Sequence, residues 1–163
     1  MKDILYAPWR DEYVKSHDIE GCVFCHISQN EPLDEELHIL YRDEFCFLVM
    51  NKYPYTPGHF MIIPHKHTDK LEDLESEVWL HMSALAQKGV RLLKEGINAH
   101  GVNIGMNLGS AGGAGIAEHI HMHLVPRWER DTNFITSIAN NRVYSTDFLK
   151  IYKKIKSLVP KYI

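Results

Sequence analysis

Residues 115–128 read GIAEHIHMHLVPRW and place histidines at three alternate positions, His119, His121 and His123. Alternate side chains of a β-strand point to one face of the sheet, so the pattern predicts a strand with three imidazoles on one side. The other side would meet a hydrophobic core through Ile120, Met122 and Leu124. A solvated polar face is the plainer interpretation, but no structural need accounts for three histidines at this period. We expect chemistry here, since imidazole serves as nucleophile, proton donor or metal ligand.

The rest of the sequence predicts an α+β fold with an antiparallel sheet. Strands are expected over 44–50, 58–67, 101–109 and 119–128. A long helix is expected over 76–98, and a C-terminal helix is expected to begin at a Thr146 cap. The apolar stripes of these helices are Trp79, Met82, Leu85, Ala86, Gly89, Leu92 and Leu93 in the first, and Phe148, Leu149, Tyr152 and Ile155 in the second.

Composition narrows the class of protein. The 163 residues carry a formal net charge of −3 and 45% hydrophobic residues, which is typical of one soluble globular domain. A mildly acidic chain without a basic patch argues against nucleic-acid binding, and no apolar run is long enough to span a membrane. The start, MKDILYAPWRDEYV, does not resemble a secretory signal, so we expect a cytoplasmic protein. Three cysteines, an odd number, argue against a disulfide framework.

A glycine-rich loop precedes the three histidines, with Gly109, Gly112, Gly113 and Gly115. Backbone N–H groups in such a loop can approach an anion closely. The loop is not a P-loop, because it lacks the Gly-Lys-Ser/Thr ending and leads into a strand. Beside three aligned histidines, it indicates a phosphate held next to a nucleophile.

The segment CVFC places Cys22 and Cys25 at the spacing of metal ligands. A tetrahedral zinc site needs two more ligands, and histidines are available in the segment IIPHKH and at His119. Two buried cysteines that act as small apolar residues are the plainer alternative. With His26 the stretch also fits the CxxCH motif of covalent haem attachment, but that chemistry needs an export signal.

These segments together resemble one protein family. HIHMHLV resembles the His-x-His-x-His-x-x signature of the histidine triad (HIT) superfamily of nucleotide hydrolases and transferases. APWRDEYV, CVFC, NKYPYTPGHFMIIPHKH, GVNIGMNLGSAGGAGIAEH and VPRWERDTNF resemble its branch of diadenosine tetraphosphate phosphorylases and hydrolases. The resemblance covers most of residues 4–145. It implies a single HIT domain over 1–163, with a zinc-binding segment at about 20–26 and a catalytic strand at about 116–128.

The resemblance also implies a role for particular residues. His121 would attack the α-phosphorus of a nucleotide and form a covalent nucleotidyl-histidine, a step that splits one displacement into two easier ones. His123 would contact the scissile region and help the leaving group to depart. Further nucleotide or phosphate contacts would come from Asn51, Asn107, Gly113 and Gly115, with Asn51 at the ribose and Asn107 near the α-phosphate.

Zinc-containing relatives ligate the metal at the positions of Cys22, Cys25, His67 and His119, so the resemblance implies a structural zinc ion here. Such a site would attach the N-terminal segment to the catalytic strand. His65 is two residues from His67 and could replace it as the ligand. The family also implies a symmetric homodimer formed partly through the helix that carries Trp79, although that helix could simply pack on its own sheet.

One position departs from the family pattern. Several members carry Gln or Ser four residues before the triad, where this chain has Gly115. The acceptor of the second step therefore stays open: phosphate would make a phosphorylase, and water would make a hydrolase, with the wider similarity favouring the phosphorylase-like branch. A nucleoside phosphoramidate hydrolase and a non-catalytic nucleotide-binding protein are the alternative functions.

Overall fold

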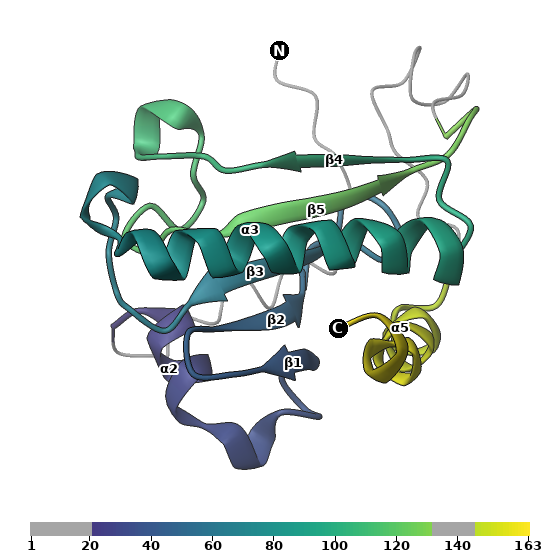
Figure 1. The fold of residues 1–163 in the computed structure, drawn as a ribbon, viewed down its shortest axis with the longest axis horizontal. Coiled ribbons are helices and arrows are strands. Elements are labelled where there is room, and N and C mark those ends of the chain that lie inside the picture. Colours follow the sequence, from purple (N-terminus) through teal and green to yellow (C-terminus); the bar gives the residue numbers. More distant parts are fainter. Residues whose placement is uncertain (1–20, 132–145) are drawn as a thin grey trace, which may run out of the picture.

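The computed structural model describes residues 21–131 and 146–163, which form a five-stranded antiparallel sheet with helices against both faces (Figure 1). The strands are β1 (Ile39–Arg42), β2 (Cys46–Met50), β3 (Phe60–Pro64), β4 (Gly101–Gly105) and β5 (Met122–Arg127). The helices are α2 (Val23–Gln29), α3 (Ser76–Arg91) and α5 (Phe148–Tyr162), with short helical turns η2 (Glu31–Leu33), η3 (Leu71–Asp73), η4 (Leu92–Gly96) and η5 (Ser110–Gly112). The strand order is β1-β2-β3-β5-β4, so the histidine strand β5 lies between β3 and the edge strand β4. The predicted α+β fold with an antiparallel sheet is confirmed.

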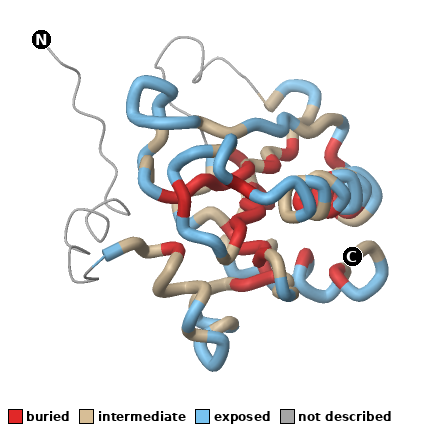
Figure 2. Tube along the Cα trace, turned by 60° about the vertical axis from the view of Figure 1, so that its left-hand side comes forward, coloured by how far each residue is buried: buried red, intermediate tan, exposed pale blue. Residues whose placement is uncertain are grey.

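Alternating side chains of the strands supply two hydrophobic clusters, one on each face of the sheet. The larger cluster lies against α3 and α5, and the smaller one includes Phe24 of α2. Figure 2 shows the buried residues gathered in the interior between these layers. Ile120, Met122 and Leu124 belong to the larger cluster, which confirms the core face predicted for this strand. The triad histidines therefore face the side of the sheet that α2 covers.

Helix α3 continues into η4, so helical structure runs from residue 76 to residue 96, close to the predicted helix. The predicted stripe is buried except for Trp79, which is half-buried. Gly89 allows the helix to approach the sheet closely. A Cβ atom at this position would lie 2.7 Å from Cδ2 of Leu124 and 3.0 Å from Cζ of Phe60.

The histidine strand is shorter than predicted. β5 begins at Met122, so His119 and His121 precede the regular ladder. The reason lies in the facing strand, where β3 ends at Pro64, a residue that has no N–H to donate. The N–H of Ile120 instead donates to the carbonyl of Thr68 at 2.8 Å. The other predicted strands correspond to β2, β3 and β4, each also shorter, whereas α2 and β1 were not predicted.

Helix α5 begins one residue later than predicted. Asp147, not Thr146, is the N-cap, and its carboxylate accepts from the N–H of Lys150 at 2.7 Å. Leu149 is 51% exposed and does not join the core, unlike the buried Tyr152. The ammonium group of Lys156 attaches the helix to β1 by donating to the carbonyls of Ile39 and Leu40, at 2.7 and 3.0 Å.

Across the described residues, the helices are too short or too polar to cross a membrane. The N-terminal segment APWRDEYV and most of the stretch DTNF after Arg130 lie outside the residues that the structure describes.

Candidate active site and metal centre

His121 is buried, and one hydrogen bond determines which of its ring nitrogens is available. Its Nδ1–H donates to the carbonyl oxygen of His119 at 2.8 Å. In the neutral imidazole the other nitrogen, Nε2, then carries a lone pair. Burial lowers the pKa of His121, which favours this neutral form. The geometry therefore leaves Nε2 of His121 as a nucleophile or base.

His123 has the opposite tautomer to His121, because a hydrogen bond from a fourth histidine, His59, determines which nitrogen carries the proton. The backbone N–H of Tyr55 donates to Nδ1 of His59 at 3.2 Å, so His59 carries its proton on Nε2. This Nε2 lies 2.9 Å from Nδ1 of His123 and donates to it. A neutral His123 therefore holds its proton on Nε2, as a donor. Its ring centroid lies 4.9 Å from that of His121, so a lone pair and a proton donor lie side by side.

Burial and neighbouring imidazoles keep the rings of His59 and His123 neutral. His59 is completely buried, and desolvation together with the neighbouring His123 and His121 lowers its pKa to about 3. Burial and His121 lower the pKa of His123 to about 4. His59 is a residue of the site that sequence reasoning missed. Its position after the PYTPG turn, at the start of a strand, was the one signal that could have marked it as part of the site.

The other predicted nucleotide contacts belong to two segments, the end of β2 and the glycine loop. The amide nitrogen of Asn51 is 3.4 Å from the ring nitrogens of His59, so the structure places Asn51 beside the fourth histidine. Asn107 instead supports the glycine loop by donating to the carbonyl of Gly113 at 3.4 Å. Gly113 has φ +87°, a backbone conformation that favours glycine. Gly115 is exposed, and a Cβ atom there would meet no atom within 4 Å.

The four predicted metal ligands come together from three separate parts of the chain. Their ligand atoms all lie within 4.8 Å of one another: those of Cys22, Cys25, His67 and His119. Sγ of Cys22 is 3.4 Å from Nδ1 of His119, and Sγ of Cys25 is 3.2 Å from Nδ1 of His67. Tetrahedral zinc places a sulfur and a nitrogen ligand about 3.5 Å apart, from bonds of about 2.3 and 2.0 Å. The residues present therefore fit a zinc ion.

The environment of His119 supports the same conclusion. Its Nε2–H donates to the carbonyl of Pro64 at 2.9 Å, which leaves Nδ1 unprotonated towards the thiols. This is the arrangement of metal-bound histidines, whose second nitrogen donates to a carbonyl or carboxylate. Burial raises the pKa of the Cys22 thiol to about 11, and a bound cation would reverse that shift by stabilising the thiolate.

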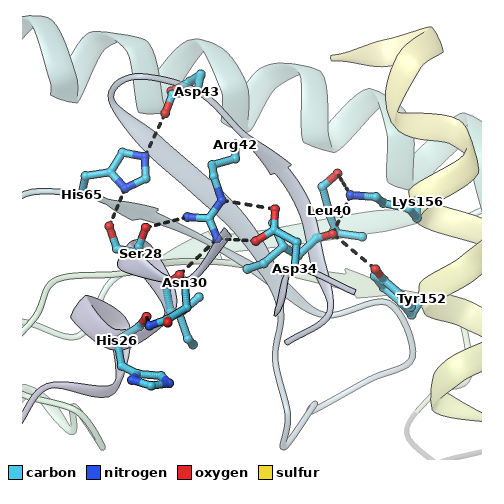
Figure 3. A network of polar contacts seen from close by, with 12 residues as sticks. His26, Ser28, Asn30, Asp34, Leu40, Arg42, Asp43, His65, Tyr152 and Lys156 are labelled. Carbon is cyan, nitrogen blue, oxygen red and sulfur yellow. Dashed lines mark hydrogen bonds and ion pairs between the residues drawn. The ribbon is translucent and has the colours of Figure 1, made fainter. Parts of the chain in front are cut away.

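His65 does not belong to this cluster, because other partners hold its ring (Figure 3). Its Nδ1 lies 2.7 Å from the hydroxyl of Ser28, and its Nε2 lies 2.8 Å from the carbonyl of Asp43. Beside it, the guanidinium group of Arg42 donates to the carbonyls of Ile27 and Ser28, both at 3.1 Å. The C-terminal end of α2 is thus attached to the sheet, and His67 is the histidine of this segment whose ring lies in the cluster.

A comparison with known protein families shows which family contains these residues. The family profile of the HIT domain matches residues 33–130, a segment that contains all three triad histidines and two of the four candidate metal ligands, His67 and His119. The chain belongs to the HIT domain family. The CVFC segment lies before the matched region, so the four candidate ligands come from the matched region and from the segment that precedes it.

HIT relatives match most of this chain. It is 36% identical to the AP-4-A phosphorylase of Mycobacterium tuberculosis over 146 residues, which is 85% of this chain and 75% of the relative. It is 27% identical to a bis(5'-adenosyl)-triphosphatase of Dictyostelium discoideum over 99 residues, 61% of this chain and 66% of the relative. A crystal structure of a zinc-bound histidine triad protein from Mycobacterium smegmatis superposes with a TM-score of 0.71, at 31% identity over 86% of this chain and 94% of that one.

Proposed function

We propose that this protein is an enzyme that cleaves dinucleoside polyphosphates, with diadenosine tetraphosphate as the substrate, through a covalent nucleotidyl-His121. The observation that carries the proposal is the pair of fixed tautomers, a free Nε2 on His121 beside a protonated Nε2 on His123. The similarity to AP-4-A phosphorylase, over most of both chains, supports the substrate class. The enzyme acts in the cytoplasm, where its thiols stay reduced.

The first step is a displacement at the α-phosphorus. Nε2 of His121 forms a bond to phosphorus, and the bond from phosphorus to the bridging oxygen breaks. The departing oxygen of ATP accepts a hydrogen bond from the Nε2–H of neutral His123, which stabilises the leaving charge while the proton stays on the ring. His121 keeps its proton on Nδ1, where the carbonyl of His119 stabilises the positive charge that develops on the ring.

The second step transfers the nucleotidyl group from His121 to an acceptor. Phosphate as acceptor gives ADP, and water gives AMP; the similarity to AP-4-A phosphorylase favours phosphate. Gly115 supplies no side chain that could orient the acceptor, so backbone N–H groups of the loop around Gly113 hold the phosphates. Asn107 fixes that loop, and Asn51 binds ribose hydroxyls at the edge of the site.

Zinc in the cluster of Cys22, Cys25, His67 and His119 has a structural role. The four ligands complete a tetrahedral set, and a closed set leaves no position for substrate. The ion therefore attaches α2 to the segment that carries the triad. Metal analysis of the purified protein is expected to give one zinc ion per chain, and less in a Cys25→Ser variant.

The enzyme acts as a homodimer built on β4 and α3. β4 is an edge strand, and a groove of about 430 Å³ runs between it and α3. The groove is lined by Trp79, Val90 and Ile104, of which Ile104 is 49% exposed. Leu80, also on α3, is 66% exposed. A second copy would cover this surface. Sedimentation is expected to give a dimer, and a monomer after Ile104→Lys.

Product analysis tests the proposed reaction. Diadenosine tetraphosphate is incubated with the enzyme or with His121→Asn, with and without phosphate. Formation of ADP and ATP that requires phosphate and is absent in the variant would support a phosphorylase. Formation of AMP and ATP that does not require phosphate would support a hydrolase. If the enzyme turned over an adenosine phosphoramidate but not diadenosine tetraphosphate, the substrate class would be wrong and the protein would be a nucleoside phosphoramidate hydrolase. Nucleotide binding with equal affinity in both proteins and no turnover would identify a non-catalytic binding protein.

A further inference from the structure

We propose that Phe24 is a positioning residue that holds the imidazole of His121 and makes its orientation depend on occupancy of the metal centre. Phe24 is one of the two residues between the candidate thiolate ligands Cys22 and Cys25, and it is only 3% exposed. Its ring centroid lies 5.1 Å from the ring of His121 and 5.6 Å from the ring of His119. One phenyl ring thus contacts a metal-ligand histidine and the proposed nucleophile.

The metal centre would restrain Phe24 from both sides. Cys22 is the N-cap residue of α2 and lies near His119, while Cys25, in the first turn, lies near His67. A metal ion bound to both thiolates would fix the first turn of the helix. Seven residues are too few for a helix that is stable alone, so the position of Phe24 depends on these attachments.

Besides the neighbouring ring of His123, two groups hold His121, and both lead back to the candidate metal ligands. Its Nδ1–H donates to the carbonyl of His119, whose ring faces the thiols. Its ring packs at 54° against Phe24. The hydrogen bond fixes one nitrogen, and the phenyl ring restricts rotation of the imidazole about its bond to Cβ. A displacement of about 1 Å at a reacting group can reduce a rate by about 100-fold. Loss of this packing would therefore lower the rate of the chemical step.

The test compares Phe24→Leu with Phe47→Leu. Phe47 is completely buried in the same cluster as Phe24, but its ring neighbours are His65 and Arg42, not the triad. Both variants lose the same atoms from the same core. We expect Phe24→Leu to lower kcat by about 10-fold or more with KM and bound zinc unchanged. Phe47→Leu should keep kcat within about 2-fold of the wild type, since it leaves the triad in place.

A second readout needs no substrate. Long-range ¹H–¹⁵N spectra at a fixed, mildly alkaline pH report which ring nitrogen of His121 carries the proton. The wild type and Phe47→Leu, both with zinc, should show His121 with its proton on Nδ1 alone. Phe24→Leu with zinc, and the wild type after chelation, should show a mixture of the two tautomers. A single Nδ1–H tautomer in Phe24→Leu, or equal losses of kcat in the two variants, would overturn the inference.

The inference rests on the proposed role of His121 as nucleophile only for its effect on kcat. If the spectra change as expected but no nucleotide is turned over by the wild type, Phe24 positions His121 and the proposed function is wrong. If the wild type turns over diadenosine tetraphosphate and the spectra of Phe24→Leu match it, the function stands and the role of Phe24 is wrong.

Discussion

Acidification is expected to destabilise the protein, and His59→Gln is expected to remove a defined part of that effect. The pKa of His59 is lowered from 6.5 to about 3 by burial and by His123 and His121. The folded protein therefore keeps this ring neutral at a pH where the unfolded chain protonates it. Its contribution to stability is complete above pH 6.5 and is lost as the pH falls from 6.5 towards 3. Between pH 7 and pH 5 the loss is about 2 kcal/mol, at about 1.4 kcal/mol per pKa unit.

Urea unfolding at pH 7 and pH 5 measures this loss as a change in the free energy of unfolding. Glutamine is chosen because its amide can donate to His123 and accept from the N–H of Tyr55, as His59 does. Groups common to both proteins, including the metal ligands, cancel when the two pH dependences are subtracted. The wild type should lose about 2 kcal/mol more than His59→Gln on going to pH 5. Equal losses in the wild type and His59→Gln would refute the reasoning.

Four further substitutions test the packing and capping of the helices by chemical or thermal unfolding. Gly89→Ala should destabilise the protein by about 1–2 kcal/mol despite the higher helix propensity of alanine, because the new Cβ would overlap Leu124; a gain in stability would contradict the close packing. Asp147→Ala should cost about 1 kcal/mol and Thr146→Ala should cost little, since only the former caps α5, and the reverse order would place the cap at Thr146. Lys156→Met should cost about 2 kcal/mol because two carbonyls of β1 lose a charged donor, and an unchanged midpoint would show that this contact contributes nothing.

The sequence predicted the parts of the fold that follow from periodicity. Alternation around His121 predicted correctly which side chains face the core, and the spacing of apolar residues predicted α3. It did not predict where the strand begins, because that depends on Pro64, which meets the histidine segment only in the folded sheet. α2 and β1 are seven and four residues long, too short to show a clear period.

The candidate site was predictable only where its residues are close in sequence or follow the family motif. His59 is 64 residues from His123, and nothing in its local pattern indicates that the two rings share a proton. The choice between His65 and His67 likewise depends on Ser28, whose hydroxyl lies at the ring of His65. Contacts between distant segments decide both questions, and they follow from the register of the sheet and the attachment of α2.

Trapping of the covalent intermediate tests the central claim, that Nε2 of His121 attacks phosphorus. Diadenosine tetraphosphate labelled in adenosine is mixed with the enzyme, quenched in alkali to preserve the phosphoramidate, and digested for mass spectrometry. We predict an adenylyl group on His121 that is lost when the quench is delayed or phosphate is added, because the acceptor then removes it. No adenylyl group is expected in His121→Asn. An adenylyl group on another residue, or turnover by His121→Asn at the wild-type rate, would contradict the account.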